Sequence, residues 1–121
     1  MTSVRLPILL ILLALFSSAL PAQELIVHEK PARLRHIQGT VVDSAGNSIP
    51  YVPIELRDAG DHHVLATNYA DGIGKFSFPD RKWGEQLEIR ASIAGFKTAQ
   101  YAISLARLGK ERLRVVLHAA N

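Results

Sequence analysis

The sequence predicts an all-β protein of about seven short strands, arranged as a sandwich or a barrel. Several stretches after residue 35 alternate apolar and polar residues with the two-residue period of a β-strand. Clusters of glycine, aspartate, asparagine and serine separate these stretches and are typical of tight turns. No stretch after residue 22 carries the long 3.6-residue period of an amphipathic helix. The spacing of strand and turn signals therefore favours an all-β fold.

The first 22 residues have the pattern of a secretory signal peptide. Residues 1–5 are weakly positive, residues 6–16 are predominantly apolar, and residues 17–22 are small and turn-forming. Cleavage after Ala19 and cleavage after Ala22 both fit this pattern. An uncleaved membrane anchor is the alternative, but a span needs about 20 apolar residues and this run is shorter. We therefore expect an exported protein, periplasmic or extracellular, with no membrane span in the mature chain.

Composition excludes several classes of site and partner. The chain has no cysteine, which excludes disulfides, thiolate metal sites and a lipid-anchored cysteine. Its formal net charge of +3 is too small to predict nucleic-acid binding, which needs a clustered basic face. The mature domain must therefore be stabilised by its apolar core.

Residues 23–35 are the least regular part of the mature chain. Leu25-Ile26-Val27 is apolar enough for a short strand, but Pro31 follows closely and has no N–H group for a sheet ladder. A run of three apolar residues does not decide the question. A linker and an extra edge strand both stay open for this segment.

Three strand candidates follow. Residues 37–42 and 52–57 alternate clearly, whereas residues 63–68 alternate less cleanly. Dense turn clusters separate the three candidates. Pro53 lies inside the second candidate, which suggests an edge position or a bulge there.

The stretch from Asp71 to Phe78 is predicted to be a glycine-rich turn that leads directly into a strand. Asp71-Gly72 and Gly74 supply the backbone freedom of this turn, because glycine reaches positive φ without a Cβ clash. Phe76 and Phe78 are two residues apart and therefore point to one face of the strand. No helix follows the glycines, so a phosphate-binding loop is not expected. We expect the turn to fix the strand register and to place both rings in the core.

Three more strands complete the predicted fold. Residues 87–93, 98–105 and 113–117 alternate apolar and polar side chains. A polar loop carrying Trp83 precedes the first of them, and a tight turn at Gly95-Phe96 follows it.

Several of these stretches carry a family resemblance. They are Ile37-Gln38-Gly39-Thr40-Val41-Val42-Asp43 with Gly46, Ile49-Pro50 and Val52-Pro53-Ile54-Glu55-Leu56; Asp71-Gly72-Ile73-Gly74-Lys75-Phe76; and Ala91-Ser92-Ile93-Ala94-Gly95-Phe96. In this order and spacing they resemble carboxypeptidase regulatory-like domains, although Ala70 stands where these domains often have threonine. The resemblance implies a seven-stranded antiparallel Greek-key β-sandwich of the transthyretin-like (prealbumin-like) or Ig-like kind, over residues 36–118. It also implies a module that is not itself catalytic.

A small secreted hydrolase or metal-dependent enzyme is the second hypothesis. One transthyretin-like group hydrolyses 5-hydroxyisourate and ends in Tyr-Arg-Gly-Ser, whereas this chain ends in His118-Ala119-Ala120-Asn121. His62 and His63 follow Asp61, but neighbouring side chains of a strand point to opposite faces, so both would bind one ion only from a loop. His36 is a further candidate. His-Glu-x-x-His and Gly-x-Ser-x-Gly motifs are missing. We therefore expect no catalytic residue, no cofactor and no metal.

Four residues are candidates for contact with a partner. Trp83 and Tyr69 offer aromatic surface to a sugar ring or a protein, although Trp83 also suits the closed end of a sandwich. Arg112 and Arg114 share one face of the last strand, where they suit an acidic partner or guard a sheet edge. The sequence thus predicts an exported, non-catalytic module that binds a protein or a glycan. A self-assembling structural surface protein is the third hypothesis.

Overall fold

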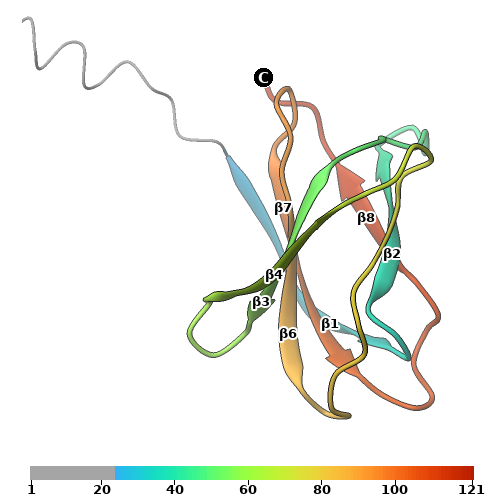
Figure 1. Cartoon of the computed structure of the whole chain (residues 1–121). Coiled ribbons are helices and arrows are strands. Elements are labelled where there is room, and N and C mark those ends of the chain that lie inside the picture. The colour runs from blue at the N-terminus through green and yellow to red at the C-terminus, as the bar shows by residue number, and fades with distance from the viewer. Residues whose placement is uncertain (1–23) are drawn as a thin grey trace, which may run out of the picture.

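The described part of the chain, residues 24–121, consists of eight strands without a helix in the computed structural model (Figure 1). The predicted all-β class is therefore confirmed. The predicted signal peptide lies outside the described residues. Within residues 24–121 no helix is long and apolar enough to cross a membrane. In chain order the strands are β1 (Leu25–Leu34), β2 (Gln38–Asp43), β3 (Pro53–Asp58), β4 (Val64–Tyr69), β5 (Lys75–Ser77), β6 (Gln86–Ala91), β7 (Thr98–Leu105) and β8 (Leu113–Leu117).

The strands form two sheets that face each other across one core (Figure 1). Five strands form the larger sheet in the order β1-β7-β6-β3-β4, and three form the smaller sheet in the order β5-β2-β8. Both sheets are mixed, because β1 pairs with β7 and β2 pairs with β8 in parallel. The purely antiparallel arrangement expected from the family resemblance is wrong for these two pairs. Each parallel pair joins strands far apart in the sequence, and alternation within a strand says nothing about the direction of its neighbour.

The segment before residue 36 forms β1, an edge strand of the larger sheet. It pairs along its length with β7, and its register shifts between His28 and Ala32. Pro31 lies within this irregularity, which is one of the few positions where a sheet accepts proline. With β1 the described residues form eight strands, one more than the seven expected.

Pro53 is the first residue of β3, and β3 lies between β6 and β4 inside the larger sheet. The expectation of an edge position or a bulge at Pro53 is therefore wrong. The register between β3 and β4 shifts at Leu56 and Arg57 instead, where Leu65 of β4 is the extra residue. The first residue of a strand also tolerates proline, because few ladder bonds involve it.

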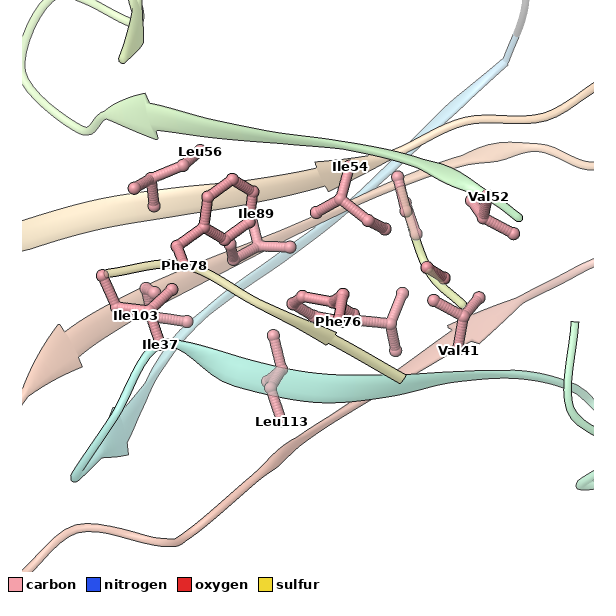
Figure 2. Close-up of a cluster of buried hydrophobic side chains, with 14 of the residues drawn as sticks. Ile37, Val41, Val52, Ile54, Leu56, Phe76, Phe78, Ile89, Ile103 and Leu113 are labelled. Carbon is pink, nitrogen blue, oxygen red and sulfur yellow. The ribbon is translucent and has the colours of Figure 1, made fainter. Parts of the chain in front are cut away.

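The core lies between the sheets and contains Phe76 and Phe78 near its centre (Figure 2). Phe76 belongs to β5, and Phe78 is the first residue after this strand. Both side chains are buried. Their rings meet edge to face, with centroids 6.4 Å apart and an interplanar angle of 67°. The largest fully buried side chains come from the predicted alternations and from the end of β1: Leu34, Ile37, Val41, Val52, Ile54, Leu56, Leu87, Ile89, Ile103, Val115 and Leu117.

Asp71 holds the turn before β5. Its Oδ1 accepts the N–H groups of Ile73 (3.0 Å) and Lys75 (2.9 Å). Gly74 has a φ of +81°, and a Cβ there would lie 2.8 Å from the carbonyl oxygen of Val41. Gly72 is outside the left-handed region, so only Gly74 uses the freedom expected of both glycines.

The second predicted turn, at Gly95-Phe96, lies beside the C-terminal segment. Gly95 has a φ of +91°, and its carbonyl accepts the N–H of Ala120 (2.9 Å). Phe96 bridges Ala119 and packs, partly buried, against the core. This turn therefore attaches the end of the chain to the domain.

Candidate functional site

A groove opens on the side of the sandwich to which the two edge strands β1 and β8 both contribute. Its volume is about 330 Å³, at the lower end of the range of small-ligand sites. We call it the basic groove, and it is lined by His28, Lys30, Ala32, Tyr101, Lys110, Arg112, Leu113 and Arg114.

Backbone contacts between β1 and the loop before β8 hold the two walls of the groove together. The N–H of Lys110 donates to the carbonyl of Arg33 (2.8 Å), and the N–H of Arg35 donates to the carbonyl of Lys110 (2.9 Å). Gly109 permits this approach, since a Cβ there would lie 2.7 Å from the Arg33 carbonyl oxygen. Lys110 is therefore held at the groove by its own main chain.

Strand alternation places the arginines on the outer wall. In β8, Leu113, Val115 and Leu117 are buried and Arg114 is exposed. Arg112 lies two residues before Arg114, directly ahead of the strand. Both arginines line the groove, and Nη2 of Arg114 also reaches the turn at Gly46, 3.4 Å from the position that a Cβ would take there.

The charge of the basic groove is unbalanced. Lys30, Lys110, Arg112 and Arg114 are all exposed, and none has an ion-pair partner within residues 24–121. No aspartate or glutamate lines the groove. Like charges that line one groove repel one another, so an anion between them would gain attraction from several cations at once.

The floor of the groove consists of rings and apolar side chains. His28 stacks on Tyr101, with ring centroids 4.1 Å apart and an interplanar angle of 5°. The Tyr101 hydroxyl accepts the N–H of Val116 (3.0 Å). Nε2 of His28 is buried without a hydrogen-bond partner, and no other buried side-chain nitrogen or oxygen in the described residues shares this condition. A buried polar atom without a partner is rare in folded proteins and calls for an explanation, such as strain, a catalytic role or a bound water or ion.

The four predicted contact residues are divided among several places. Arg112 and Arg114 line the basic groove. Tyr69 is 63% exposed at the end of β4, and Trp83 is 53% exposed in the loop between β5 and β6. Trp83 therefore does not close the end of the sandwich with a buried indole. Lys30, His28 and Tyr101 were not among the predicted contact residues, because the pairing of β1 with β7 and the contact of Tyr101 with β8 join parts of the chain that are far apart in the sequence.

A second hollow, of about 370 Å³, brings Tyr69 and Arg112 together with Asp71. It carries both signs of charge, because Asp71 is negative while Lys75 and Arg112 are positive. The Asp71 carboxylate already accepts two backbone N–H groups of its own turn. This hollow is therefore less suited to a charged ligand than the basic groove.

The candidate histidines do not share a site. His36 Nδ1 lies 3.0 Å from Asp80, His62 Nδ1 lies 2.9 Å from Glu88, and His63 pairs with Asp61. His118 is exposed after β8. Three of the four are thus paired with separate carboxylates, which gives no common centre for a reaction or for an ion.

One group within residues 24–121 has the spacing of metal ligands: Asp58, Asp61 and His63, whose donor atoms lie within 4.8 Å of one another. Hydrogen bonds of the hairpin account for this geometry. The Asp58 carboxylate accepts the N–H of Gly60 (2.7 Å), and that of Asp61 accepts the N–H of His63 (3.0 Å). Such loop-capping carboxylates are common without an ion, so the cluster fits a turn better than a metal site.

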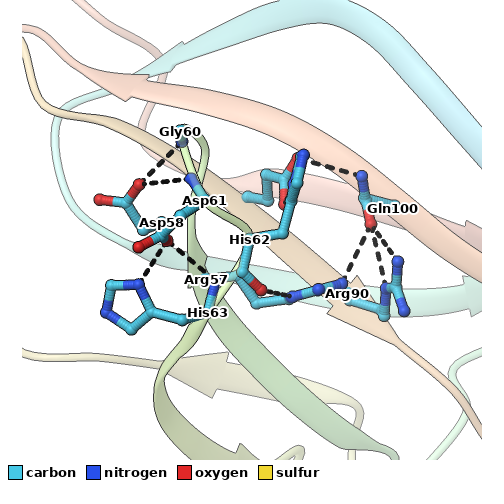
Figure 3. Close-up of polar contacts among 9 residues, drawn as sticks. Arg57, Asp58, Gly60, Asp61, His62, His63, Arg90 and Gln100 are labelled. Carbon is cyan, nitrogen blue, oxygen red and sulfur yellow. Dashed lines mark hydrogen bonds and ion pairs between the residues drawn. The ribbon is translucent and has the colours of Figure 1, made fainter.

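A polar network that the sequence did not predict covers the outer face of the larger sheet (Figure 3). Gln100 accepts from Arg90 Nη2 (2.7 Å) and donates to Glu88 (3.1 Å), which also bonds His62. Arg57 completes the network through the His62 carbonyl (2.8 Å). Glu88 and Gln100 are buried under these long side chains. Because its members are partnered with one another, the network stabilises the sheet, and the basic groove remains the candidate site.

No model of a known protein family matches this chain, and a comparison with curated proteins finds no significant match. The function must therefore be inferred from the residues and their geometry.

Proposed function

We propose that the protein is an exported, non-catalytic β-sandwich module that binds an acidic partner, a protein or a glycan, through the basic groove. The observation that carries this proposal is the set of four exposed cations without ion pairs on one side of the sandwich. The proposed place of action is the cell envelope or the space outside the cell, from the signal-peptide pattern of residues 1–22.

The same proposal includes a carboxypeptidase regulatory-like, transthyretin-like fold. Two facing sheets support it, as do the Asp71 turn and the Gly95-Phe96 corner at the positions of the family motifs. In this proposal β2 to β8 are the seven strands of the family sandwich and β1 is an addition. Domains of this kind accompany other activities, which agrees with a binding role.

Electrostatics explains why the groove would select acidic partners. Four positive charges around one concave surface raise the local concentration of anions and speed their association. Salt weakens such an attraction because the Debye length is only about 8 Å at physiological ionic strength. Binding through the groove is therefore expected to weaken strongly as salt rises.

Binding of two anionic polymers, poly-glutamate and dextran sulfate, tests the proposal. We expect the purified exported protein to bind at least one of them and to ignore neutral dextran. The double variant Lys30→Gln/Arg114→Gln should bind roughly tenfold more weakly, because each removed charge contributes a fraction of a kcal/mol at an exposed site.

Lys82→Gln is the matched control, since Lys82 is exposed and basic but lies outside the groove. It should bind like the wild type. Equal losses in both variants, or no binding to either anionic polymer at low salt, would rule out the groove as the binding site.

Self-assembly is a second candidate, and the free edge of β4 favours it. Residues Val64–Tyr69 contain neither a charge nor a proline, two of the devices that protect an edge strand. Ala70 donates its N–H to Val52 on the β3 side, so alternation turns the backbone groups of Thr67 toward the free edge. The register shift leaves Leu65 as an extra residue of β4, so a second copy of the chain would pair with the stretch after this bulge.

Sedimentation velocity over a concentration series tests this second candidate. Wild-type protein should self-associate, and Thr67→Lys should shift it toward monomer because a charge at the edge opposes strand pairing. Ser44→Lys, in an exposed turn, should change nothing. A wild type that stays monomeric at every concentration would remove self-assembly and leave the binding proposal intact.

A further inference from the structure

Both edge strands beside the basic groove are interrupted as templates for strand addition. On β8, the Tyr101 hydroxyl takes the N–H of Val116, and Lys97 donates its N–H to the carbonyl of His118 just beyond the strand (2.8 Å). On β1, Pro31 lies inside an irregular register. A peptide that binds a sandwich edge generally adds a strand through main-chain hydrogen bonds. The groove offers no continuous row of such bonds.

The floor favours a ligand with a ring. His28 and Tyr101 present a stacked aromatic pair, and Ala32 and Leu113 add apolar surface beside it. Apolar walls with a few placed polar groups are the usual composition of small-ligand sites. The Tyr101 hydroxyl, which already accepts one N–H, keeps its own O–H to donate to a ligand.

The rim favours an anionic ligand. Lys30 lies on β1, Lys110 and Arg112 lie in the segment before β8, and Arg114 lies on β8, so cations flank the apolar floor on both sides. Arginine binds carboxylate and sulfate-like groups through two parallel N–H donors, and lysine binds them as a point charge. A ring that carries such a group satisfies the floor and the rim together.

Resting on the proposed function, we infer that the basic groove binds an acidic glycan, in which a sugar ring lies on the His28–Tyr101 floor and its carboxylate or sulfate lies between the rim cations. The volume of about 330 Å³ suits a short segment of such a chain. An acidic peptide without aromatic side chains would meet the same charges, but it would gain little from the floor and would find only an interrupted edge for strand pairing.

Calorimetric titration with four matched ligands tests this inference on the exported protein. The ligands are an oligogalacturonate, a heparin-derived oligosaccharide, a malto-oligosaccharide of equal length and an oligo-glutamate peptide of equal charge. We expect one or both acidic oligosaccharides to bind about tenfold more tightly than the peptide, and the neutral sugar to bind most weakly. Comparison of the two acidic sugars shows whether carboxylate or sulfate is preferred.

Two variants separate the floor from the rim. His28→Ala removes one ring of the floor and should weaken acidic sugars severalfold while leaving peptide binding unchanged. Lys30→Gln/Arg114→Gln should weaken acidic sugars and peptide alike, and Lys82→Gln should weaken neither. Thermal unfolding checks that each variant is folded. If His28→Ala unfolds, the comparison of sugars with peptide on the wild type still tests the ligand class, and the rim pair, on exposed side chains, still tests the place of binding.

The outcomes distinguish this inference from the proposed function. If the peptide binds as tightly as the acidic sugars, the glycan inference is overturned and the binding proposal stands. If none of the three acidic ligands binds, both fail. If His28→Ala weakens peptide and sugars equally, the floor does not recognise a ring and the inference fails as well.

Discussion

At the scale of single residues, two acidic turns of this chain follow the same design. Asp43 and Asp71 each accept two backbone N–H groups, from the residues two and four positions later. In each turn a glycine three positions after the aspartate has positive φ, Gly46 at +89° and Gly74 at +81°. The pattern Asp-x-x-Gly-x therefore encodes the same local geometry twice, once after β2 and once before β5.

Gly74 is expected to be the more sensitive of the turn glycines. Gly74→Ala should lower the free energy of unfolding by about 3 kcal/mol, because the new Cβ combines left-handed strain with a clash against the Val41 carbonyl oxygen, 2.8 Å away. Gly84→Ala is the matched control, since Gly84 has nearly the same φ of +80° and no atom lies within 4 Å of the position that a Cβ would take there. It should lose only about 1 kcal/mol from strain.

Chemical denaturation of both variants measures the difference. If the two alanine variants lose equal stability, the contact with Val41 contributes nothing and the turn does not depend on close approach. If Gly74→Ala unfolds at the wild-type denaturant concentration, the role of this turn in fixing the register of β5 is wrong.

At the scale of elements, alternation predicted the strands that bury one face against the core. Leu87 and Ile89 of β6, for example, are buried as their pattern indicated, and Phe76 lies in the core beside them. The same reasoning could not place Lys30 near Arg112. That neighbourhood depends on the parallel pairing of β1 with β7, which follows from long-range packing and leaves no trace in a single strand's period.

β1 is expected to be an integral part of the domain. Its last residue, Leu34, is 1% exposed, whereas its first residue, Leu25, is 42% exposed. Leu34→Ala should therefore lower the free energy of unfolding by about 3 kcal/mol, the cost of removing a buried leucine side chain. Leu25→Ala should change it by about 0.5 kcal/mol or less, as is usual at the surface.

Urea denaturation of the two leucine variants checks this expectation. A small loss for Leu34→Ala would mean that residues 24–35 add little to the fold and act as a linker. In that case the wall of the basic groove formed by Lys30 would also be loosely held.

At the scale of the whole molecule, the two proposed interaction surfaces lie at opposite edges of the larger sheet. β1 borders the basic groove, and β4 ends the sheet on the other side. The edges beside the groove are interrupted by Tyr101, Lys97 and Pro31, whereas β4 carries no charge and no proline. If both proposals hold, one sandwich separates binding by charge and ring from strand pairing, and a ligand in the groove leaves the β4 edge accessible.

The stability of the whole domain is expected to fall in acid, because folding lowers the pKa values of four carboxyl groups. The pKa values of Asp43, Asp61 and Asp71 are lowered from their ordinary value of 3.8, above all by hydrogen bonds from the backbone N–H groups of Asn47, His63 and Lys75 respectively. The pKa of Glu85 is lowered chiefly by the side-chain hydrogen bonds of Arg81.

The direction of the effect follows from these lowered values. As pH falls through 3.8, the unfolded chain takes up protons that the folded chain still refuses. The stabilisation is therefore complete well above pH 3.8 and disappears as pH falls through the lower pKa values of the folded state. Thermal unfolding between pH 5 and pH 2 should show a falling midpoint, with net proton uptake on unfolding.

Asp43→Asn/Asp71→Asn should flatten this pH dependence, because asparagine keeps an acceptor oxygen in each turn but does not titrate. The cause also predicts how salt acts. Short hydrogen bonds to backbone N–H groups are little screened, so the slope contributed by these two aspartates should persist at about 1 M salt, whereas an effect of distant surface charges would vanish there. A double variant with the full wild-type slope would show that other groups control the acid sensitivity of the domain.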